Sequence, residues 1–156
     1  MDAFGTFYQS HRERLYGYLV RLSGDPELAR DLVQDSFIRY MSAYDKEVPA
    51  APLLYTIARN AFIDHVRKKR MDHREIDQET AAGPERSLLV REEYRLVIKA
   101  LQRLDSDERD ILSLAVSSGL SYREIASVTG LSEMNVKVKV HRARQKLRQL
   151  LGEMHQ

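Results

Sequence analysis

The sequence contains no cysteine. This absence excludes disulfide bonds, thiolate metal sites and cysteine nucleophiles, and it is consistent with a cytoplasmic protein. No apolar run approaches the roughly 18 residues of a membrane-spanning helix, so we expect no direct membrane insertion. The first residues carry an acid at position 2 and no apolar stretch before a cleavage site, so we expect no signal peptide.

The patterns that usually hold cofactors and metals are also missing. The seven glycines are scattered and form neither a P-loop nor a dinucleotide-binding fingerprint. The five histidines are dispersed, without the HExxH pattern or a similar ligand spacing. We therefore expect a protein that is not an enzyme and that uses no cofactor, no metal ion and no small-molecule substrate.

What the sequence does contain is helical periodicity and unevenly placed charge. Hydrophobic residues make up 43% of the 156 residues, which is enough for a core. The length allows one domain or two small ones. A net charge of +2 is too small to indicate a partner, so the partner has to be inferred from where the charges lie.

The first half of the chain predicts three helices. The first ends at Gly24, and Asp25 can cap a second helix that begins at Pro26. Proline lacks a backbone N–H, but at the first position of a helix this donor would have no partner within the helix. The two prolines of segment 44–52 predict a loop, and a third helix is expected over 53–70. Residues expected on the buried sides of these helices are Phe4, Tyr8, His11, Leu15, Tyr18, Leu22, Ala29, Val33, Phe37, Tyr40, Leu54, Ile57, Ala58 and Ala61.

The composition changes in segment 71–86. Apolar periodicity vanishes there, five acids face two bases, and Gly83-Pro84 interrupts the chain. Such a segment is typical of an acidic linker. We therefore expect an amino-terminal domain over 1–70 and a carboxyl-terminal domain over 87–156.

The second half also predicts helices. Helicity resumes near Ser87, with a stripe made of Val90, Tyr94, Val97, Leu101 and Leu104. Asp105 with Glu108, and Ser121 with Glu124, have the spacing of capping boxes, so a helix is expected after each pair. These two helices are expected to end at Gly119 and Gly130.

The segment Asn135–Arg144 is ambiguous on first inspection. Its valines alternate with lysines, which is typical of a half-buried strand. A helix capped by Ser132 and running to about Leu151 would instead have a stripe of four turns. That stripe contains Val136, Val140, Ala143, Leu147 and Leu150. The longer pattern favours the helix, so we expect an all-α fold.

The spacing of Ala126, Gly130 and Val136 predicts a helix-turn-helix. Two helices that cross steeply need a small contact residue on the first helix, a turn residue that tolerates positive φ, and an aliphatic residue on the second helix. These three residues satisfy those needs in that order. The carboxyl-terminal domain is therefore expected to contain this motif.

The outer face of the last predicted helix is basic. Between Lys137 and Arg148 there are six bases and no acid. A solvated helix face is the simpler interpretation, but such a face usually mixes signs. Together with the helix-turn-helix spacing, the pattern indicates nucleic-acid binding. Residues expected to reach base edges are Glu133, Met134, Asn135, Val138 and Lys139, and those expected on phosphates are Arg142, Arg144 and Lys146.

Two patterns in the amino-terminal domain stay open on spacing alone. On the second predicted helix, Glu27, Asp31 and Asp35 follow each other at four-residue intervals, beside Gln34 and Ile38. This strip is either a solvated face or a docking strip for a basic protein surface. The third helix ends in the run RKKR, which is either solvated or a site for single-stranded nucleic acid.

Three segments together resemble one known family. GDPELARDLVQDSFIRYM, LLYTIARNAFIDHVRKKR and GLSYREIASVTGLSEMNVKVKVHRARQKLRQLL are similar, in order and spacing, to the characteristic regions of bacterial extracytoplasmic-function (ECF) sigma factors. The resemblance covers nearly the whole chain except the linker. It implies two helical domains and a role in transcription initiation. The implied partners are core RNA polymerase, through its clamp helices and flap, promoter DNA, and an anti-sigma protein.

The resemblance also implies roles for individual residues. Those matching the strip that docks on the polymerase clamp helices are Asp31, Gln34, Asp35 and Ile38, while Phe37 is expected to pack inside. Those matching the part that melts and reads the −10 element are Lys46, Arg59, Asn60, Asp64, Arg67 and Lys68. Those matching the −35 reader are Ser132, Met134, Asn135, Lys137, Val138, Lys139, Arg142 and Arg144. The linker is implied to pass through the polymerase channel that later holds RNA.

A second function is compatible with part of the sequence. A DNA-binding regulator that is not a polymerase subunit would account for the helix-turn-helix. It would leave the acidic strip and the third helix unexplained.

Overall fold

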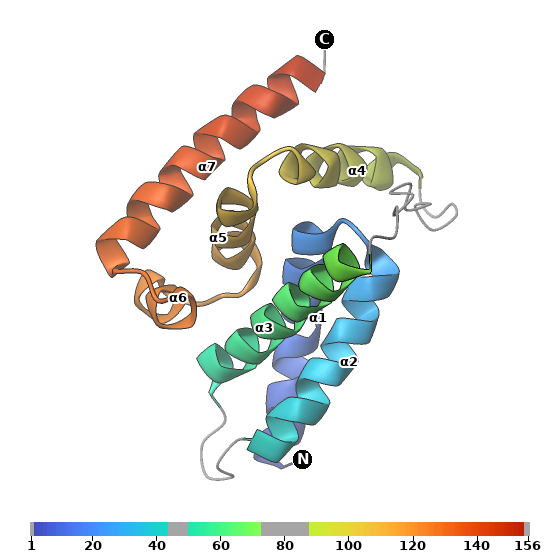
Figure 1. Cartoon of the computed structure of the whole chain (residues 1–156), viewed down its shortest axis with the longest axis vertical. Coiled ribbons are helices and arrows are strands. Elements are labelled where there is room, and N and C mark those ends of the chain that lie inside the picture. The colour runs from blue at the N-terminus through green and yellow to red at the C-terminus, as the bar shows by residue number, and fades with distance from the viewer. Residues whose placement is uncertain (1, 44–49, 73–87, 155–156) are drawn as a thin grey trace.

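The computed structural model describes residues 2–43, 50–72 and 88–154. These residues form seven α-helices and no strand. Figure 1 shows how the helices are arranged. Their bounds are α1 Ala3–Ser23, α2 Pro26–Ala43, α3 Ala51–Met71, α4 Leu88–Gln102, α5 Ser106–Ser117, α6 Tyr122–Thr129 and α7 Glu133–Met154. The predicted acidic linker lies almost wholly outside the described residues, because only Met71 and Asp72 of it are described.

The turn between α1 and α2 forms as the sequence predicts. Gly24 has a φ of 71° and donates its N–H to the carbonyl oxygen of Val20 at 2.8 Å, which closes α1. The Asp25 carboxylate accepts from the N–H groups of Glu27 and Leu28 at 3.1 and 3.2 Å. Local capping chemistry therefore sets this turn without help from the rest of the fold.

Helices α1, α2 and α3 pack into a bundle around aromatic side chains. Phe7 stacks on Tyr40 with ring centroids 5.0 Å apart, and Tyr8 meets the edge of Phe37 at 4.8 Å. The Tyr40 hydroxyl accepts the N–H of Ala50 at 2.7 Å, which fixes the chain just before α3. Aromatic pairs such as Phe7–Tyr40 and Tyr8–Phe37 stabilise a fold by about 0.5–1.5 kcal/mol each, beyond the contribution of the apolar area that they bury.

The predicted loop 44–52 is wrong at its last two residues, since α3 begins at Ala51. Pro52 lies in the first turn of the helix, where a residue without an N–H is tolerated. The described part of the loop is Ala50 alone, so the prediction for 44–49 lies outside the described residues.

Helices α4 to α7 confirm the predicted caps. Asp105 and Ser121 each form a complete capping box, with Glu108 and Glu124 respectively. Gly130 has a φ of 79° and closes α6 before the turn into α7. The last helix runs three residues beyond the predicted end at Leu151.

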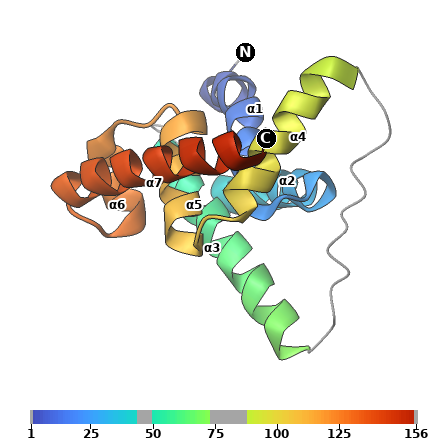
Figure 2. The same ribbon diagram turned by 90° about the horizontal axis from the view of Figure 1, so that it is seen from above.

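The segment that alternates valine and lysine is helical, which settles the ambiguity in the sequence. Val136, Val140 and Ala143 are buried on α7, while Lys137 and Lys139 are exposed. Figure 2 shows α7 crossing over α5, which it contacts. Tertiary packing of the valine stripe therefore outweighs the strand propensity of single residues.

One predicted core residue is exposed, whereas the others whose side chains the structure describes are buried or partly buried. Tyr94 of α4 is 38% exposed, and the guanidinium of Arg21 lies 5.7 Å from the centre of its ring. The helical stripe predicted Tyr94 on the inner side of α4, but the buried side chains that the structure describes on this helix are Ala100 and Leu101, near its end. Val97 is partly buried, and Leu101 is fully buried.

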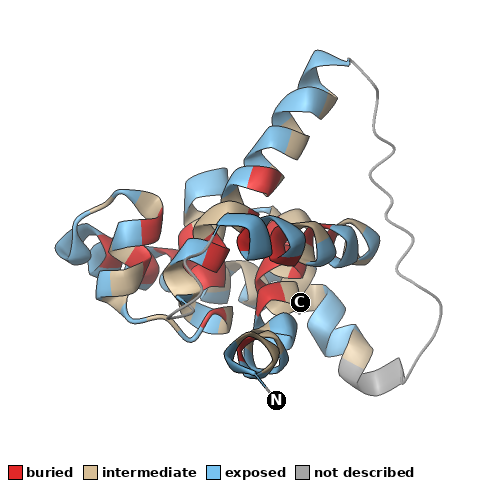
Figure 3. Cartoon of the chain, turned by 90° about the horizontal axis from the view of Figure 1, so that it is seen from below, coloured by how far each residue is buried: buried red, intermediate tan, exposed pale blue. Residues whose placement is uncertain are grey.

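The two groups of helices pack on each other. Helix α5 lies against α1, and α6 lies against α3, so one buried cluster extends through both groups, as the red residues in Figure 3 indicate. The two helices approach each other closely at Gly17 of α1, where a Cβ would lie at an ordinary contact distance of 3.5 Å from the Oγ of Ser117 on α5. The interface also carries polar contacts, and these bear directly on the candidate sites.

Candidate nucleic-acid and protein interfaces

The outer face of α7 presents the residues predicted to read duplex DNA. Met134 is 69% exposed and Val138 is 37% exposed, although both are apolar. The Oγ of Ser132 accepts the N–H of Asn135 at 3.1 Å, so this serine also caps the helix. All eight residues predicted for this site are exposed: Ser132, Met134, Asn135, Lys137, Val138, Lys139, Arg142 and Arg144.

The acidic strip on α2 is a second exposed surface. Glu27, Asp31 and Gln34 are exposed, and Asp35 forms a 3.0 Å ion pair with Arg39 that is about half accessible to water. Phe37 is buried, as expected. The carboxylates therefore lie on the side of α2 that faces away from the core.

Two apolar side chains accompany the acidic strip. Ile38 is 65% exposed and Met41, which the sequence interpretation missed, is 54% exposed. The spacing of three residues between them would have placed Met41 on the same face. Exposed apolar side chains beside charges are a feature of protein-binding surfaces.

Helix α3 carries most of the residues predicted to contact single-stranded DNA. Asn60, Asp64, Arg67 and Lys68 are exposed, and Asp64 pairs with Arg67 along the helix. They share one side because they stand at helix positions i, i+4, i+7 and i+8. Lys46 lies outside the described residues.

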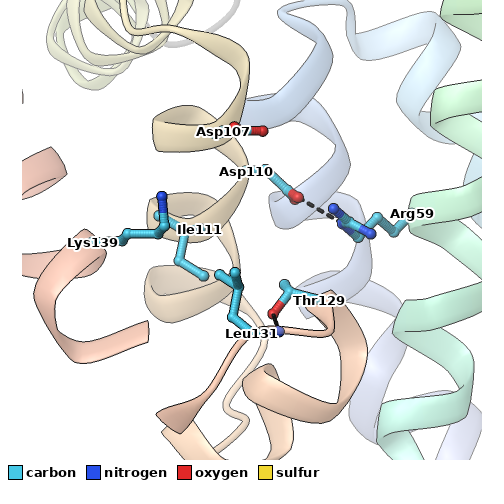
Figure 4. A pocket seen from close by; sticks show the side chains of 7 residues that line it. All are labelled: Arg59, Asp107, Asp110, Ile111, Thr129, Leu131 and Lys139. Carbon is cyan, nitrogen blue, oxygen red and sulfur yellow. Dashed lines mark hydrogen bonds and ion pairs between the residues drawn. The ribbon is translucent and has the colours of Figure 1, made fainter. Parts of the chain in front are cut away.

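Arg59, also predicted for this site, lies in a different environment. Its Nε donates to Oδ2 of Asp110 on α5 at 2.6 Å, and the two side chains are 24% and 14% exposed. The Tyr18 hydroxyl on α1 donates to the other carboxylate oxygen at 2.7 Å. Asp110 therefore joins α1 and α3 to α5 through both of its oxygens, and Figure 4 shows Arg59 pointing toward it.

The electrostatics of this cluster follow from its burial. Burial by itself lowers the pKa of Arg59, but the Asp110 carboxylate, with smaller effects from Tyr18 and Asp107, raises that pKa above its ordinary value. Burial, and then the negative Asp110, raise the pKa of Tyr18 well above its usual range. Arg59 is therefore a cation and Tyr18 a neutral donor at any physiological pH.

A pocket of about 160 Å³ adjoins the same cluster. Its lining comes from α3, α5, the end of α6, the turn that follows and α7 (Figure 4): Arg59, Asp107, Asp110, Ile111, Thr129, Leu131 and Lys139. It brings Arg59 and Lys139, predicted for two different DNA elements, to one place. Two residues of opposite charge accompany them, so the pocket is not a dedicated anion site.

Within the described ranges, no group of acids and histidines has a metal-binding arrangement. The helices that the structure describes include none that is long and apolar enough to cross a membrane.

Comparison with known proteins decides between the two functions that the sequence left open. Residues 7–71 match the family description "Sigma-70 region 2", and residues 94–147 match "Sigma-70, region 4". RNA polymerase sigma factor CarQ of Myxococcus xanthus is 33% identical, over 98% of this chain and 91% of the relative. ECF RNA polymerase sigma factor SigM of Bacillus subtilis is 31% identical, over 92% of this chain and 91% of the relative.

The chain belongs to the ECF sigma factor family. It is an RNA polymerase sigma factor for transcription initiation, and this family consists of initiation factors that are not enzymes. Region 2 covers α1 from Phe7 onward together with α2 and α3, and region 4 covers most of α4, all of α5 and α6, and α7 as far as Leu147. The helix-turn-helix of this sigma factor is formed by α6 and α7 and belongs to region 4.

Two solved structures resemble this sigma factor over almost its whole length. The sigma factor RpoE in complex with the anti-sigma factor NepR from Bartonella quintana has a TM-score of 0.74 at 26% identity, covering 97% of this chain and 98% of RpoE. CnrH in complex with the cytosolic domain of CnrY has a TM-score of 0.72 at 30% identity, covering 97% of this chain and 88% of CnrH.

The cluster of Asp110 with Arg59 and Tyr18 was not predicted from the sequence of the sigma factor. Helix α5 has three acids in its first five residues, and two of them have ordinary local roles as capping or exposed groups. The available signal was the position of Asp110 beside buried Ile111, which places it near the inner side of the helix. Its partners lie 51 and 92 residues away in the chain, so no local pattern names them.

Proposed function

We propose that three helices divide the work of this sigma factor. Helix α2 docks on the clamp helices of the polymerase through Asp31, Gln34, Asp35 and Ile38, α3 contacts the −10 element, and α7 reads the −35 element as duplex. The supporting observation is the opposite charge of these exposed faces. An acidic face with apolar neighbours suits a basic protein surface, and acid-poor basic faces suit phosphates.

The division of the chain follows from these roles. We assign residues 1–70 to polymerase docking and −10 recognition, 71–86 to an acidic linker, and 87–156 to −35 recognition. The end of α3 at Met71 and the start of α4 at Leu88 support these limits. The partners in this proposal are cytoplasmic, so the protein acts in the cytoplasm.

We assign the step that opens the DNA duplex to α3. Asn60 and Lys68 lie exposed on the same helix as the Asp64–Arg67 pair, where an unpaired base and its phosphates could be held. Extracting a base from the duplex costs a few kcal/mol, which stacking and edge hydrogen bonds offset. We assign Arg59 to the same strand contact.

An anti-sigma protein is a further proposed partner. The support is structural, since RpoE and CnrH were each solved with an anti-sigma protein or its cytosolic domain, and both resemble this chain over 97% of its length. The proposal is that a similar protein binds this sigma factor while its two regions are packed together.

Binding to core polymerase tests the docking assignment directly. Core polymerase mixed with the purified sigma factor should elute with it as one complex in size-exclusion chromatography. Potassium permanganate should then detect unpaired thymines in a promoter fragment only when both are present. A sigma factor that elutes separately from core, or unreactive thymines in the complex, would reject the assignment.

A further inference from the structure

The packing of region 2 on region 4 includes an ion pair that crosses between them. Arg59 belongs to α3 and Asp110 to α5, and the pair is mostly shielded from water. The hydroxyl of Tyr18 completes the contact from α1. Among the described side chains proposed to contact the −10 strand, Arg59 is thus the one with an ion pair to the other region.

The contact competes with DNA for the same guanidinium. A carboxylate and a phosphate offer similar oxygen acceptors to arginine, and charge-assisted hydrogen bonds to either are strong. While Oδ2 of Asp110 accepts from Nε of Arg59 at 2.6 Å, that donor is not available to a phosphate or a base. The negative carboxylate would also repel an approaching phosphate.

Two further hydrogen bonds across the interface are to backbone carbonyls. Gln102 donates from Nε2 to the carbonyl oxygen of Arg21 at 2.9 Å, and Arg109 donates from Nη1 to that of Leu22 at 3.4 Å. Both contacts lie at the end of α1. They hold the two regions together without occupying a residue assigned to promoter DNA.

We propose that Asp110 is an internal latch: it holds region 4 against region 2 and withholds Arg59 from the −10 strand until the two regions separate. The functional half of this inference rests on the proposed role of α3, whereas the conformational half does not. Promoter binding and the closed state then exclude each other, because both need the same guanidinium. A population shift toward the open state would follow from any partner that binds only that state.

Such a latch is reversible because a buried ion pair is nearly balanced by the cost of removing its charges from water. Its net strength depends on satisfying the remaining acceptor, which the Tyr18 hydroxyl does. Removing either the charge of Asp110 or the hydroxyl of Tyr18 should therefore favour the open state.

The test measures the distance between the regions. Because the chain has no cysteine, Ser10→Cys on α1 and Gln149→Cys on α7 introduce two unique labelling sites for donor and acceptor dyes, both at exposed positions. Asp110→Asn and Tyr18→Phe should each shift the closed-to-open ratio toward open on the order of tenfold, lowering the mean transfer efficiency. Asp107→Asn is the matched control, because it removes a neighbouring charge that lines the same pocket without forming the ion pair.

The transfer efficiencies of the variants decide whether the latch exists. Equal transfer efficiencies in Asp110→Asn, Tyr18→Phe, Asp107→Asn and the unsubstituted chain would overturn the latch. Far-UV circular dichroism checks that each variant keeps its helices, and Tyr18→Phe, which retains the buried ring, decides the matter if Asp110→Asn unfolds.

A second arm tests whether opening releases Arg59. A labelled single-stranded DNA of mixed sequence should bind the Asp110→Asn variant more tightly than the Asp107→Asn control by on the order of tenfold. Adding Arg59→Ala should abolish this gain. A gain that survives Arg59→Ala, or no gain in a variant that opens, would overturn the withholding of Arg59. Failure to bind core polymerase would instead reject the proposed function and leave the distance measurement unaffected.

Discussion

Gln102, at the end of α4, packs against Gly24, at the end of α1, so closely that a Cβ on Gly24 would lie 2.9 Å from the Cδ of Gln102. Gly24 also has a φ of 71°, which side-chain-bearing residues rarely adopt. One glycine therefore serves both to end a helix and to seat region 4 on region 2.

Gly24→Ala should destabilise the protein. Positive φ alone costs about 1–2 kcal/mol for a residue with a Cβ, and the contact with Gln102 adds to this. Urea denaturation should show the loss as a lower midpoint. Gly152→Ala is the control, because it lies in α7 with open space around its Cβ position, and should be neutral or stabilising by up to about 1 kcal/mol. Equal effects of the two substitutions would contradict the role of Gly24.

The acidic strip predicts a charge-reversal effect. Asp31→Arg with Asp35→Arg should weaken binding to core polymerase by at least about tenfold, because both charges would meet a basic partner with the wrong sign. Fluorescence anisotropy of the labelled sigma factor with core measures the affinity. Glu93→Arg with Glu153→Arg makes the same change in net charge at exposed positions elsewhere and should bind normally. Similar losses in both double variants would mean that net charge, not the strip, governs docking.

Removing the side chain of Arg142 should cause a loss of DNA affinity that does not depend on the DNA sequence. It lies exposed on the basic face of α7, beyond the turn expected to reach bases. Arg142→Ala should weaken binding to all −35 variants nearly equally and reduce the slope of log affinity against log salt by about 1. A marked change in base preference would argue for a base contact instead.

Substitutions at Asn135 and Val138 should have the opposite effect, a change in base preference without a change in the salt slope. Both lie exposed in the first two turns of α7, and Val138 could touch a thymine methyl group. Asn135→Ala and Val138→Ser should each change the preferred −35 sequence at one position while the salt slope stays the same. Selection from a randomised −35 library measures this preference, and an unchanged profile would make the residue a passive part of the surface.

His11 predicts a pH effect on stability. It packs against the ring of Phe7 at 4.7 Å, and burial, with a smaller effect of Arg14, lowers its pKa from the ordinary 6.5. Below pH 6.5 the unfolded chain therefore takes up a proton at this site before the folded chain does. The free energy of unfolding should fall as the pH drops from 6.5 through the lower pKa of the folded state.

His11→Phe should flatten this pH dependence. Urea denaturation at several pH values between 5 and 7.5 gives the slope, to which His65, whose pKa burial also lowers, contributes as well. Tyr8→Phe changes the same aromatic cluster without removing an imidazole and should keep the full slope. An unaltered slope in His11→Phe would show that this site does not couple folding to protonation.

How far the sequence predicts this molecule depends on the range of the interactions involved. Helix ends were predictable at Gly24, Asp105 and Ser121 because a cap uses residues within three or four positions of itself. The exposed face of α7 was predictable for the same reason, since one stripe of buried valines fixes where the lysines point.

The packing of the two regions was not predictable from such patterns. Asp110, Arg59 and Tyr18 are far apart in the chain, and no local pattern around any one of them indicates the other two. From the sequence alone, Asp107 and Glu108 are equally plausible partners for Arg59 and Tyr18. The orientation of α5 against α1 decides which acid faces them. The exposure of Tyr94 was missed for a related reason, because the tilt of α4 decides which turns of its stripe reach the core.

The central claim is that this chain is itself the subunit that lets polymerase start transcription. Run-off transcription with purified core polymerase, free of other sigma factors, on a promoter fragment from upstream of its own gene tests it most directly. The account predicts a transcript of defined length with the unsubstituted chain and none with the Asp31→Arg, Asp35→Arg variant. A chain that binds the fragment but yields no transcript with core alone would contradict it, and would indicate a DNA-binding regulator instead.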